Sequence, residues 1–334
     1  MKIAVVGAGA IGGYLGVRLA HSDEDVTFIA RGANLAAIRA GGMKLILEDG
    51  SELRAEGARA FERMSDVGPQ DVVLLTLKAH QVAAVAPDLN QLCHETTSVV
   101  TMQNGIPWWY FHKHGGQYDG TPVVSADPDG SIARGIDAAR VIGSVVYPAA
   151  NLVSPGVVQV VEGNRFTLGE LDGSTTPRIE AVSASFTKAG FKAPVSKNIR
   201  SEIWLKLWGN LSFNPVSALT HATLVDICQF PLTRDLAAQM MAEAEAIAKK
   251  LGITFPVSIE RRIAGAEKVG AHKTSMLQDV EQGRPIEIEA LAGSVVELGR
   301  LTQTPTPHIS AVYACASLLA KVLNVRHAKL TLDA

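Results

Sequence analysis

The stretch that most constrains the fold is the first twenty residues. Residues 2–6 form a short apolar run typical of a buried strand, GAGAIG at 7–12 follows it, and a helical pattern begins at once. Glycines spaced GxGxxG between a strand and a helix are the fingerprint of a dinucleotide site, because they allow a tight turn, close approach of a pyrophosphate, and close packing of the helix on the strand. The helix N-terminus then faces the phosphates. The residues expected to contact the cofactor are Gly7, Gly9, Ala10, Ile11 and Gly12.

The end of the second strand indicates which dinucleotide binds. This strand covers residues 26–29 and is followed by Ala30 and Arg31, with no acidic residue between Val26 and Leu47. An NAD site normally carries an acid here for the ribose 2′-hydroxyl, whereas a guanidinium suits a 2′-phosphate. Arg31 therefore predicts NADPH, and the alternative is an arginine that only caps an exposed loop.

Two further apolar strands, at residues 72–78 and 98–104, complete the pattern of a parallel sheet covered on both faces. Lys78 with Gln81, and Asn104, follow the carboxyl ends of these strands, where a doubly wound sheet binds its ligands. Each is alternatively an ordinary polar residue at a strand end. Short strands with turn signals between about residues 121 and 171 predict an antiparallel extension of this sheet.

The second half of the chain has helical periodicity instead. Helical patterns occur near residues 199–220, 232–251, 258–264, 286–302 and 308–322. We therefore predict an α/β protein with an N-terminal Rossmann-type doubly wound domain at 1–195 and an all-α domain at 196–334. The polar segment at 274–289 is expected to be a solvated loop.

A polar ridge stands out in the first of these helices. Lys206, Asn210 and Asn214 are each four positions apart within an apolar stretch, so they share one face of a helix that is otherwise buried. A purely structural interpretation is a snorkelling lysine with two amides bonded to backbone. Pro215 cannot donate a backbone N–H, so the helix is expected to kink or break there.

Composition excludes several classes of function. The formal net charge is −2, from 31 basic and 33 acidic residues without long runs, which argues against nucleic acid or an anionic membrane as partner. Three distant cysteines and the isolated pair His112 and His114 indicate neither a disulfide framework nor a metal site. No signal peptide and no uninterrupted apolar stretch of about 20 residues is evident, so a soluble cytoplasmic protein acting on small molecules is expected.

Together these features resemble the ketopantoate reductase (2-dehydropantoate 2-reductase) family over nearly the whole chain. The motifs that carry the resemblance are GAGAIGG at 7–13, Arg31, LKAHQ at 77–81, QNG at 103–105, KLWGNLSFNP at 206–215, and SMLQD at 275–279 with Glu287 after it. The resemblance implies that NADPH reduces the 2-oxo acid 2-dehydropantoate to pantoate, a step of pantothenate biosynthesis, in a cleft between the two domains. It leaves a homodimer open.

The resemblance also implies roles for individual residues. Lys206 matches the family's catalytic lysine, and Glu287 matches the acid near the reacting oxygen. Residues matching those that bind the substrate are Asn210, Asn214 and Ser275; residues matching those that line the cofactor and the substrate entrance are Lys78, Gln81 and Asn104. Hydride addition to a ketone leaves negative charge on its oxygen, which an ammonium can stabilise and protonate. Lys206 is therefore expected to be the general acid, tuned by Glu287.

Two departures from the family leave the substrate open. Trp108, Trp109 and Tyr110 follow QNG where many relatives have small or polar residues, and His272 replaces a common asparagine. The aromatic residues either pack in the interior or line a pocket for a larger 2-oxo acid. A hypothesis of another class is a noncatalytic NADPH-binding redox sensor, which would have no use for Lys206 and its neighbours.

Overall fold

The computed structural model describes residues 1–331, and the chain forms two compact units. Unit 1 comprises Met1–Gln103, Phe111–Pro122 and Asp129–Ile199. Unit 2 comprises Asn104–Tyr110, Val123–Pro128 and the residues from Arg200 onward. Two short segments of the first half of the chain therefore belong to the second unit.

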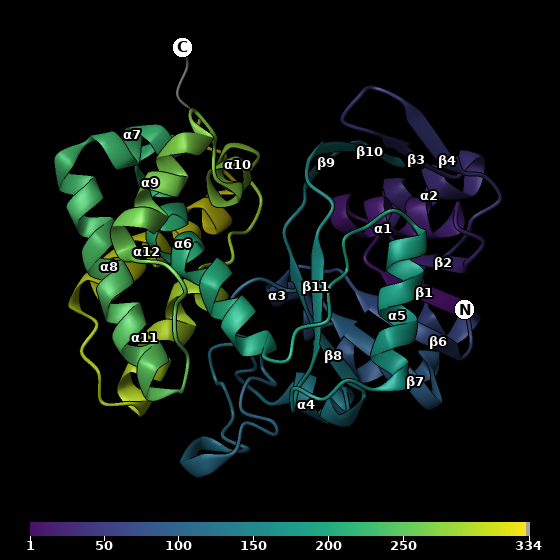
Figure 1. Cartoon of the computed structure of the whole chain (residues 1–334). Coiled ribbons are helices and arrows are strands. Elements are labelled where there is room, and N and C mark those ends of the chain that lie inside the picture. Colours follow the sequence, from purple (N-terminus) through teal and green to yellow (C-terminus); the bar gives the residue numbers. More distant parts are fainter. Residues whose placement is uncertain (332–334) are drawn as a thin grey trace. The chain divides into compact units, whose positions relative to one another are not determined.

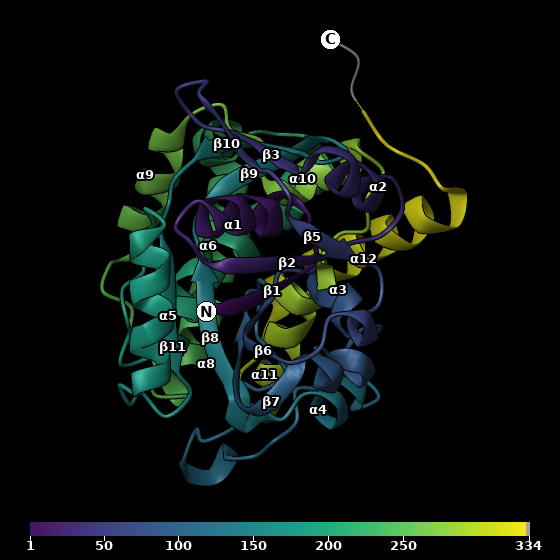
Figure 2. The ribbon, with the colours of Figure 1, turned by 90° about the vertical axis from the view of Figure 1, so that its right-hand side faces the viewer.

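Unit 1 is built on a seven-stranded sheet with the order β11-β8-β7-β6-β1-β2-β5. Figure 2 shows β2, β1, β6 and β7 side by side. All neighbouring pairs are parallel except β8 and β11. The strands are β1 (Lys2–Val6), β2 (Asp25–Ile29), β5 (Arg59–Phe61), β6 (Gln70–Leu75), β7 (Cys93–Thr101), β8 (Val141–Val146) and β11 (Phe166–Glu170). The predicted α/β class with a parallel N-terminal sheet is confirmed.

A second, four-stranded sheet has the order β4-β3-β10-β9. Its strands are β3 (Met43–Ile46), β4 (Glu52–Ala55), β9 (Ala149–Ser154) and β10 (Val157–Glu162). The predicted antiparallel extension of the main sheet is therefore wrong in part, because β8 joins it in parallel and β9 and β10 leave it. The hairpin of β3 and β4 offers an edge with which β10 pairs, placing Val158 beside Leu45.

Helix α1 (Ala10–Ala20) packs between the two sheets (Figure 1). Gly16 of this helix faces the main sheet, and Gly13 faces the second sheet. A Cβ atom at Gly16 would overlap the ring of Phe28 in the main sheet, and one at Gly13 would lie 2.6 Å from the Val158 side chain in the second sheet. The glycine-rich sequence of α1 thus lets one helix approach two sheets closely.

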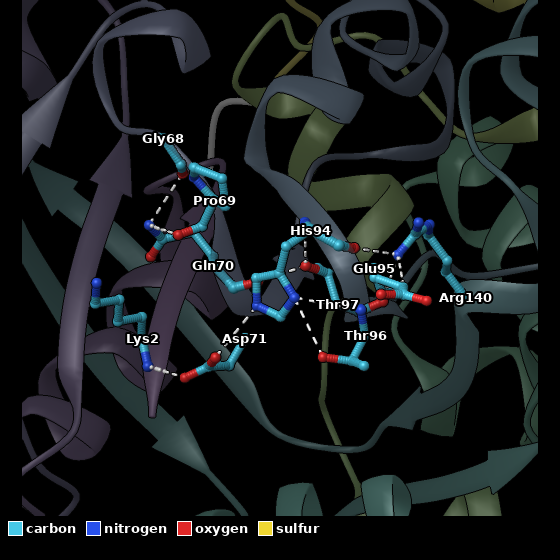
Figure 3. Close-up of polar contacts among 10 residues, drawn as sticks. All are labelled: Lys2, Gly68, Pro69, Gln70, Asp71, His94, Glu95, Thr96, Thr97 and Arg140. Carbon is cyan, nitrogen blue, oxygen red and sulfur yellow. Dashed lines mark hydrogen bonds and ion pairs between the residues drawn. The ribbon is translucent and has the colours of Figure 1, made fainter.

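The amino ends of the central strands are tied by a polar network (Figure 3). The Lys2 backbone N–H donates to Asp71 at 2.7 Å, and the His94 ring lies 3.3 Å from the same carboxylate. The Thr97 hydroxyl donates to the Gln70 carbonyl at 2.6 Å, joining β7 to β6. These hydrogen bonds therefore lie at the amino ends of the strands, whereas the glycine turn follows the carboxyl end of β1.

The other helices of unit 1 are short or peripheral. They are α2 (Gly32–Gly41), α3 (Ala79–Val82), α4 (Ser131–Gly135), α5 (Pro177–Lys188) and the 3₁₀ turns Met64–Asp66, Ala86–Leu92, Gly116–Tyr118 and Ala138–Arg140. Between β6 and β7 the chain forms α3 and the 3₁₀ turn Ala86–Leu92.

Among the described residues, unit 2 contains helices only. They are α6 (Ile199–Thr220), α7 (Leu224–Gln229), α8 (Pro231–Lys250), α9 (Ile259–Val269), α10 (Ser275–Glu281), a π-helical turn (Glu289–Gly293), α11 (Ser294–Leu301) and α12 (Pro307–Arg326). The helical C-terminal region is confirmed.

Two local predictions in this unit are wrong in whole or in part. Helix α6 continues through Pro215 without the predicted break, because Phe213, Val216 and Ala218 around the proline are all buried and hold the helix in place; a kink at Pro215 stays a prediction. The segment predicted as a solvated loop contains α10, which buries Met276 and Leu277; its N-cap residue is Thr274, whose hydroxyl accepts the Leu277 N–H at 3.2 Å.

Helix α12 differs from the others in its exposure. Leu318, Val322 and Val325 are exposed by 62%, 37% and 71%. Within residues 1–331 it is the one helix long and apolar enough to cross a membrane, judged by length and composition only, which is weak evidence for a membrane span.

Candidate active site

The glycine turn of unit 1 has the geometry of an anion cradle. Gly7 follows β1 with a φ of +103°, which favours glycine, and a Cβ atom at Gly12 would overlap the Gly7 carbonyl oxygen. At Gly9, by contrast, an added Cβ atom would meet nothing within 4 Å. Helix α1 starts here with no capping side chain and no acid in its first turn, so the N–H groups of its first turn remain available to a phosphate.

Arg31 follows the end of β2 and is the N-cap residue of α2. Its side chain is exposed, and its guanidinium makes no hydrogen bond or ion pair with any other of residues 1–331. Nearby Asn34, which the sequence did not single out, donates to the Ala8 carbonyl and accepts the Gly156 N–H at 2.7 Å. Asn34 therefore ties the glycine turn to the second sheet; its position in the sequence carries no signal of this role.

The polar residues after β6 and β7 have mixed roles. The Gln81 side chain accepts the Lys78 N–H at 3.1 Å and so caps α3. Gln103 was noted in the sequence only as part of the QNG motif, without a role of its own, yet its amide donates to the carbonyls of Leu75 and Leu77 at 2.8 and 3.0 Å. Gln103 thereby fixes the carboxyl end of β6 immediately before the chain enters unit 2 at Asn104.

Lys206 is the central residue of the unit 2 site. Its ammonium donates to the Asn104 side-chain carbonyl at 2.7 Å, across 102 positions of sequence. Burial lowers the pKa of Lys206 to about 8, even though the Glu287 carboxylate raises it in part. Lys206 is therefore an ammonium that can release its proton near neutral pH.

Helix α6 carries the rest of the polar ridge beside Lys206. Asn214 is buried, and its amide lies 3.5 Å from the Ser275 hydroxyl at the start of α10. Asn210 is partly exposed, and its side chain makes no hydrogen bond with the described part of the chain. One ammonium, two amides and a hydroxyl thus belong to one helical unit.

The three consecutive aromatic residues divide into two groups. Trp109 and Tyr110 are buried, and the Tyr110 hydroxyl accepts the indole N–H of Trp204 at 2.7 Å. The Arg200 guanidinium donates to the Tyr110 carbonyl at 2.7 Å. Trp108 is partly exposed, and its buried indole N–H has no partner within the described residues. Trp109 and Tyr110 therefore pack in the interior of unit 2, and Trp108 alone remains a candidate for contact with a substrate.

An anion cradle on a doubly wound sheet, together with a partly buried lysine of lowered pKa in a helical unit, defines an oxidoreductase that uses a nicotinamide dinucleotide. The chain matches the family described as ketopantoate reductase PanE/ApbA over residues 3–173 and the C-terminal domain of that family over residues 198–320. It belongs to the ketopantoate reductase family, and it is an oxidoreductase acting on a CH–OH group.

Individual relatives cover nearly the whole chain. It is 53% identical to the 2-dehydropantoate 2-reductase of Mesorhizobium japonicum, over 96% of this chain and 98% of the relative. A crystal structure of a protein from Ralstonia solanacearum, classed as a ketopantoate reductase, superposes with a TM-score of 0.92 at 40% identity, covering 97% and 98% of the two chains. The structure of 2-dehydropantoate 2-reductase from Geobacter metallireducens gives a TM-score of 0.83 at 27% identity, covering 95% and 99%.

Proposed function

We propose that this enzyme reduces 2-dehydropantoate to pantoate with NADPH, and that Lys206 donates the proton. The observation that carries the proposal is the hydrogen bond of 2.7 Å from Lys206 to Asn104, on a lysine whose pKa is lowered to about 8. The name of the relative at 53% identity supports the choice of substrate. Membership of an enzyme family is the reason to set the redox-sensor hypothesis aside.

The residues of unit 1 fit a nicotinamide dinucleotide phosphate. The open space at Gly9 and the uncapped start of α1 would receive the pyrophosphate, and the exposed Arg31 guanidinium would receive the 2′-phosphate. When bound, the cofactor supplies the hydride. Lys78 and Gln81, which follow β6, remain proposed neighbours of the cofactor.

The choice between NADPH and NADH rests on Arg31. A D-mandelate dehydrogenase of the same fold, at 22% identity, is described in a structure with NADH, so the fold alone does not decide. We expect Arg31→Ala to weaken NADPH binding while leaving NADH binding nearly unchanged, as measured by fluorescence titration of both cofactors. Equal effects on the two would remove Arg31 as the reader of the 2′-phosphate.

The proton chemistry belongs to Lys206. As hydride adds to the ketone carbon, the carbonyl oxygen gains negative charge, and the ammonium beside it stabilises that charge and transfers its proton to give the alcohol. The neutral amine then takes a proton from water before the next cycle. The Asn104 side-chain carbonyl accepts a hydrogen bond from the Lys206 ammonium, and the Glu287 carboxylate favours the charged form of Lys206. Both residues therefore keep Lys206 protonated before hydride transfer.

The amides and hydroxyl of the site would hold the substrate in place. Asn210, Asn214 and Ser275 offer donors and acceptors to the hydroxyl and carboxylate groups of a small 2-oxo acid without adding charge. Orientation of this kind contributes to rate independently of the proton donor. We therefore expect Asn210→Ala to raise KM more than it lowers kcat.

The decisive experiment is NADPH oxidation by the purified enzyme with 2-dehydropantoate and a panel of larger 2-oxo acids. Lys206→Ala should reduce kcat by about 10²- to 10⁴-fold with little change in NADPH affinity. Residual activity equal to wild type would remove Lys206 from the mechanism. Preference for a larger acid would support the alternative substrate class and make Trp108 the first residue to test.

We also propose that the enzyme works as a homodimer in the cytoplasm, in pantothenate biosynthesis. A related fold from Staphylococcus aureus is described as dimeric. The exposed residues Ala311, Cys315, Leu318, Val322 and Val325 of α12 follow a 4-3-4-3 spacing, which is the seam of a helix that pairs with another helix. The small side chains lie at one end of the seam and the larger ones at the other, so an antiparallel second copy would fill the space best. Light scattering of Leu318→Lys, expected to be monomeric, tests this assembly.

A further inference from the structure

The π-helical turn at Glu289–Gly293 lies between Glu287 and α11. Such turns add one residue to a helix and are enriched at functional sites. Here the Ala290 carbonyl accepts two hydrogen bonds from outside the helical backbone ladder. One is from the Ile106 N–H at 3.1 Å, and the other is from the Ser294 hydroxyl at 2.6 Å. The loop that follows β7 is therefore bonded to the backbone of this turn.

Gly105 permits this contact. Its φ is +87°, a conformation that favours glycine, and a Cβ atom at this position would overlap the Ala290 carbonyl oxygen. Ile106, the next residue, is 1% exposed. The requirement is thus both conformational and steric, since any side chain at Gly105 would push the loop away from the π-helical turn.

Asn104 and Glu287, which stabilise the Lys206 ammonium, are close in sequence to the residues that make this contact. Asn104, which accepts the ammonium hydrogen bond, directly precedes Gly105. Glu287 is three residues before Ala290, and its carbonyl accepts the Leu291 N–H at 3.2 Å, within the same helical segment. A shift between the loop and the turn would therefore move one partner of Lys206 relative to the other.

We propose that Gly105 is a positioning residue: by seating its loop on the π-helical turn at Ala290, it holds Asn104 and Glu287 together around Lys206. This proposal rests on the proposed role of Lys206 as proton donor. Gly105 itself contributes no side chain, so its effect is exerted entirely through Asn104 and the backbone of the turn.

The test compares two glycine variants in unit 2. Gly105→Ala combines a left-handed backbone with a steric overlap, whereas Gly252→Ala has a similar φ of +77° with nothing within 4 Å. We expect Gly105→Ala to lower kcat by about 10- to 100-fold, since displacements near 1 Å at a reacting group have effects of this size. The alkaline limb of its kcat/KM profile should also move to lower pH, because the displaced loop carries Asn104 away from the Lys206 ammonium. Gly252→Ala should keep the wild-type limb.

A folded Gly105→Ala enzyme with the wild-type limb would overturn the proposal. Because this variant could fail to fold, NMR of the wild-type protein provides a second test. The backbone resonances of Ile106 and Ala290 should titrate with the same midpoint as the Lys206 side-chain nitrogen, and resonances that stay constant through that titration would also overturn the proposal. An active Lys206→Ala enzyme would instead refute the proton-donor role while leaving this NMR result unaffected.

Discussion

The hydrogen bond between Lys206 and Asn104 allows substitutions of Asn104 to lower or to raise the pKa of Lys206, and with it the pH at which activity falls. Asn104→Ala removes the acceptor that lies 2.7 Å from the ammonium. A hydrogen bond to a charged donor contributes about 1.5–3 kcal/mol and one to a neutral donor about 0.5–1.5 kcal/mol. The difference of roughly 1–1.5 kcal/mol favours the ammonium, and its loss lowers the pKa of Lys206 by about one. The pKa should therefore fall from about 8 to roughly 7.

Asn104→Asp should have the opposite effect. It places a carboxylate at the same distance from the ammonium, and an opposite charge so close changes a pKa by roughly 1–3. The pKa of Lys206 should rise to about 9 or more. Because a more basic ammonium is a weaker acid, the plateau rate of Asn104→Asp should also be lower than that of the wild type.

The assay is kcat/KM for NADPH oxidation from pH 5 to 10, since this ratio reports the free enzyme. Lys206 must be protonated to donate, so wild-type activity should fall as pH rises through about 8. At pH 8 the protonated fraction in Asn104→Ala should be about fivefold below wild type, and near pH 6 the two fractions should be almost equal. Alkaline limbs at one common pH in all three enzymes would refute Lys206 as the titrating acid.

Other features of the structure give further predictions. Gly9→Ala should leave the melting temperature unchanged but weaken NADPH binding by about tenfold, while Gly12→Ala should destabilise unit 1 by about 1–3 kcal/mol because its Cβ overlaps backbone. Tyr110→Phe should destabilise by about 1–3 kcal/mol in urea unfolding, since it leaves the Trp204 N–H unpaired. The backbone N–H of residue 2, with other hydrogen bonds, holds the pKa of Asp71 below its usual value. The stabilisation by this carboxylate is thus present above about pH 4 and lost as pH falls through the lower folded pKa. The unfolding free energies of wild type and Asp71→Asn should therefore converge in acid; a constant difference down to pH 2 would contradict this.

The sequence predicted those elements whose periodicity is long and regular. The parallel sheet follows from apolar strands, and α6 begins and ends at the predicted residues because its apolar pattern spans 22 positions. The second sheet was missed because β3 and β4 have only four residues each, and because β3 pairs with β10, a strand more than a hundred positions later. No local pattern encodes such pairing. Short helices such as α10 were missed for the same reason of length.

The site shows the same division between local and distant information. The ridge of Lys206, Asn210 and Asn214 could be seen in the sequence because one helix carries it. Asn104 as the acceptor for Lys206 could not be derived from residues 102 positions apart; its place after a strand and the family resemblance indicated only that it lines the site. Which of several acids influences Lys206 was equally open from composition, and the structure indicates Glu287. Gly105 and Gln103 act through backbone contacts, which leave no side-chain signal in a single sequence.

The position of α1 between two sheets has a consequence for motion. A helix covered on both faces can open only when one of the sheets separates from it, so its amide protons should exchange with solvent among the slowest in unit 1. The glycine turn at its start is held by the same packing. A phosphate would then meet N–H groups that are already ordered, and cofactor binding should require little loss of backbone entropy.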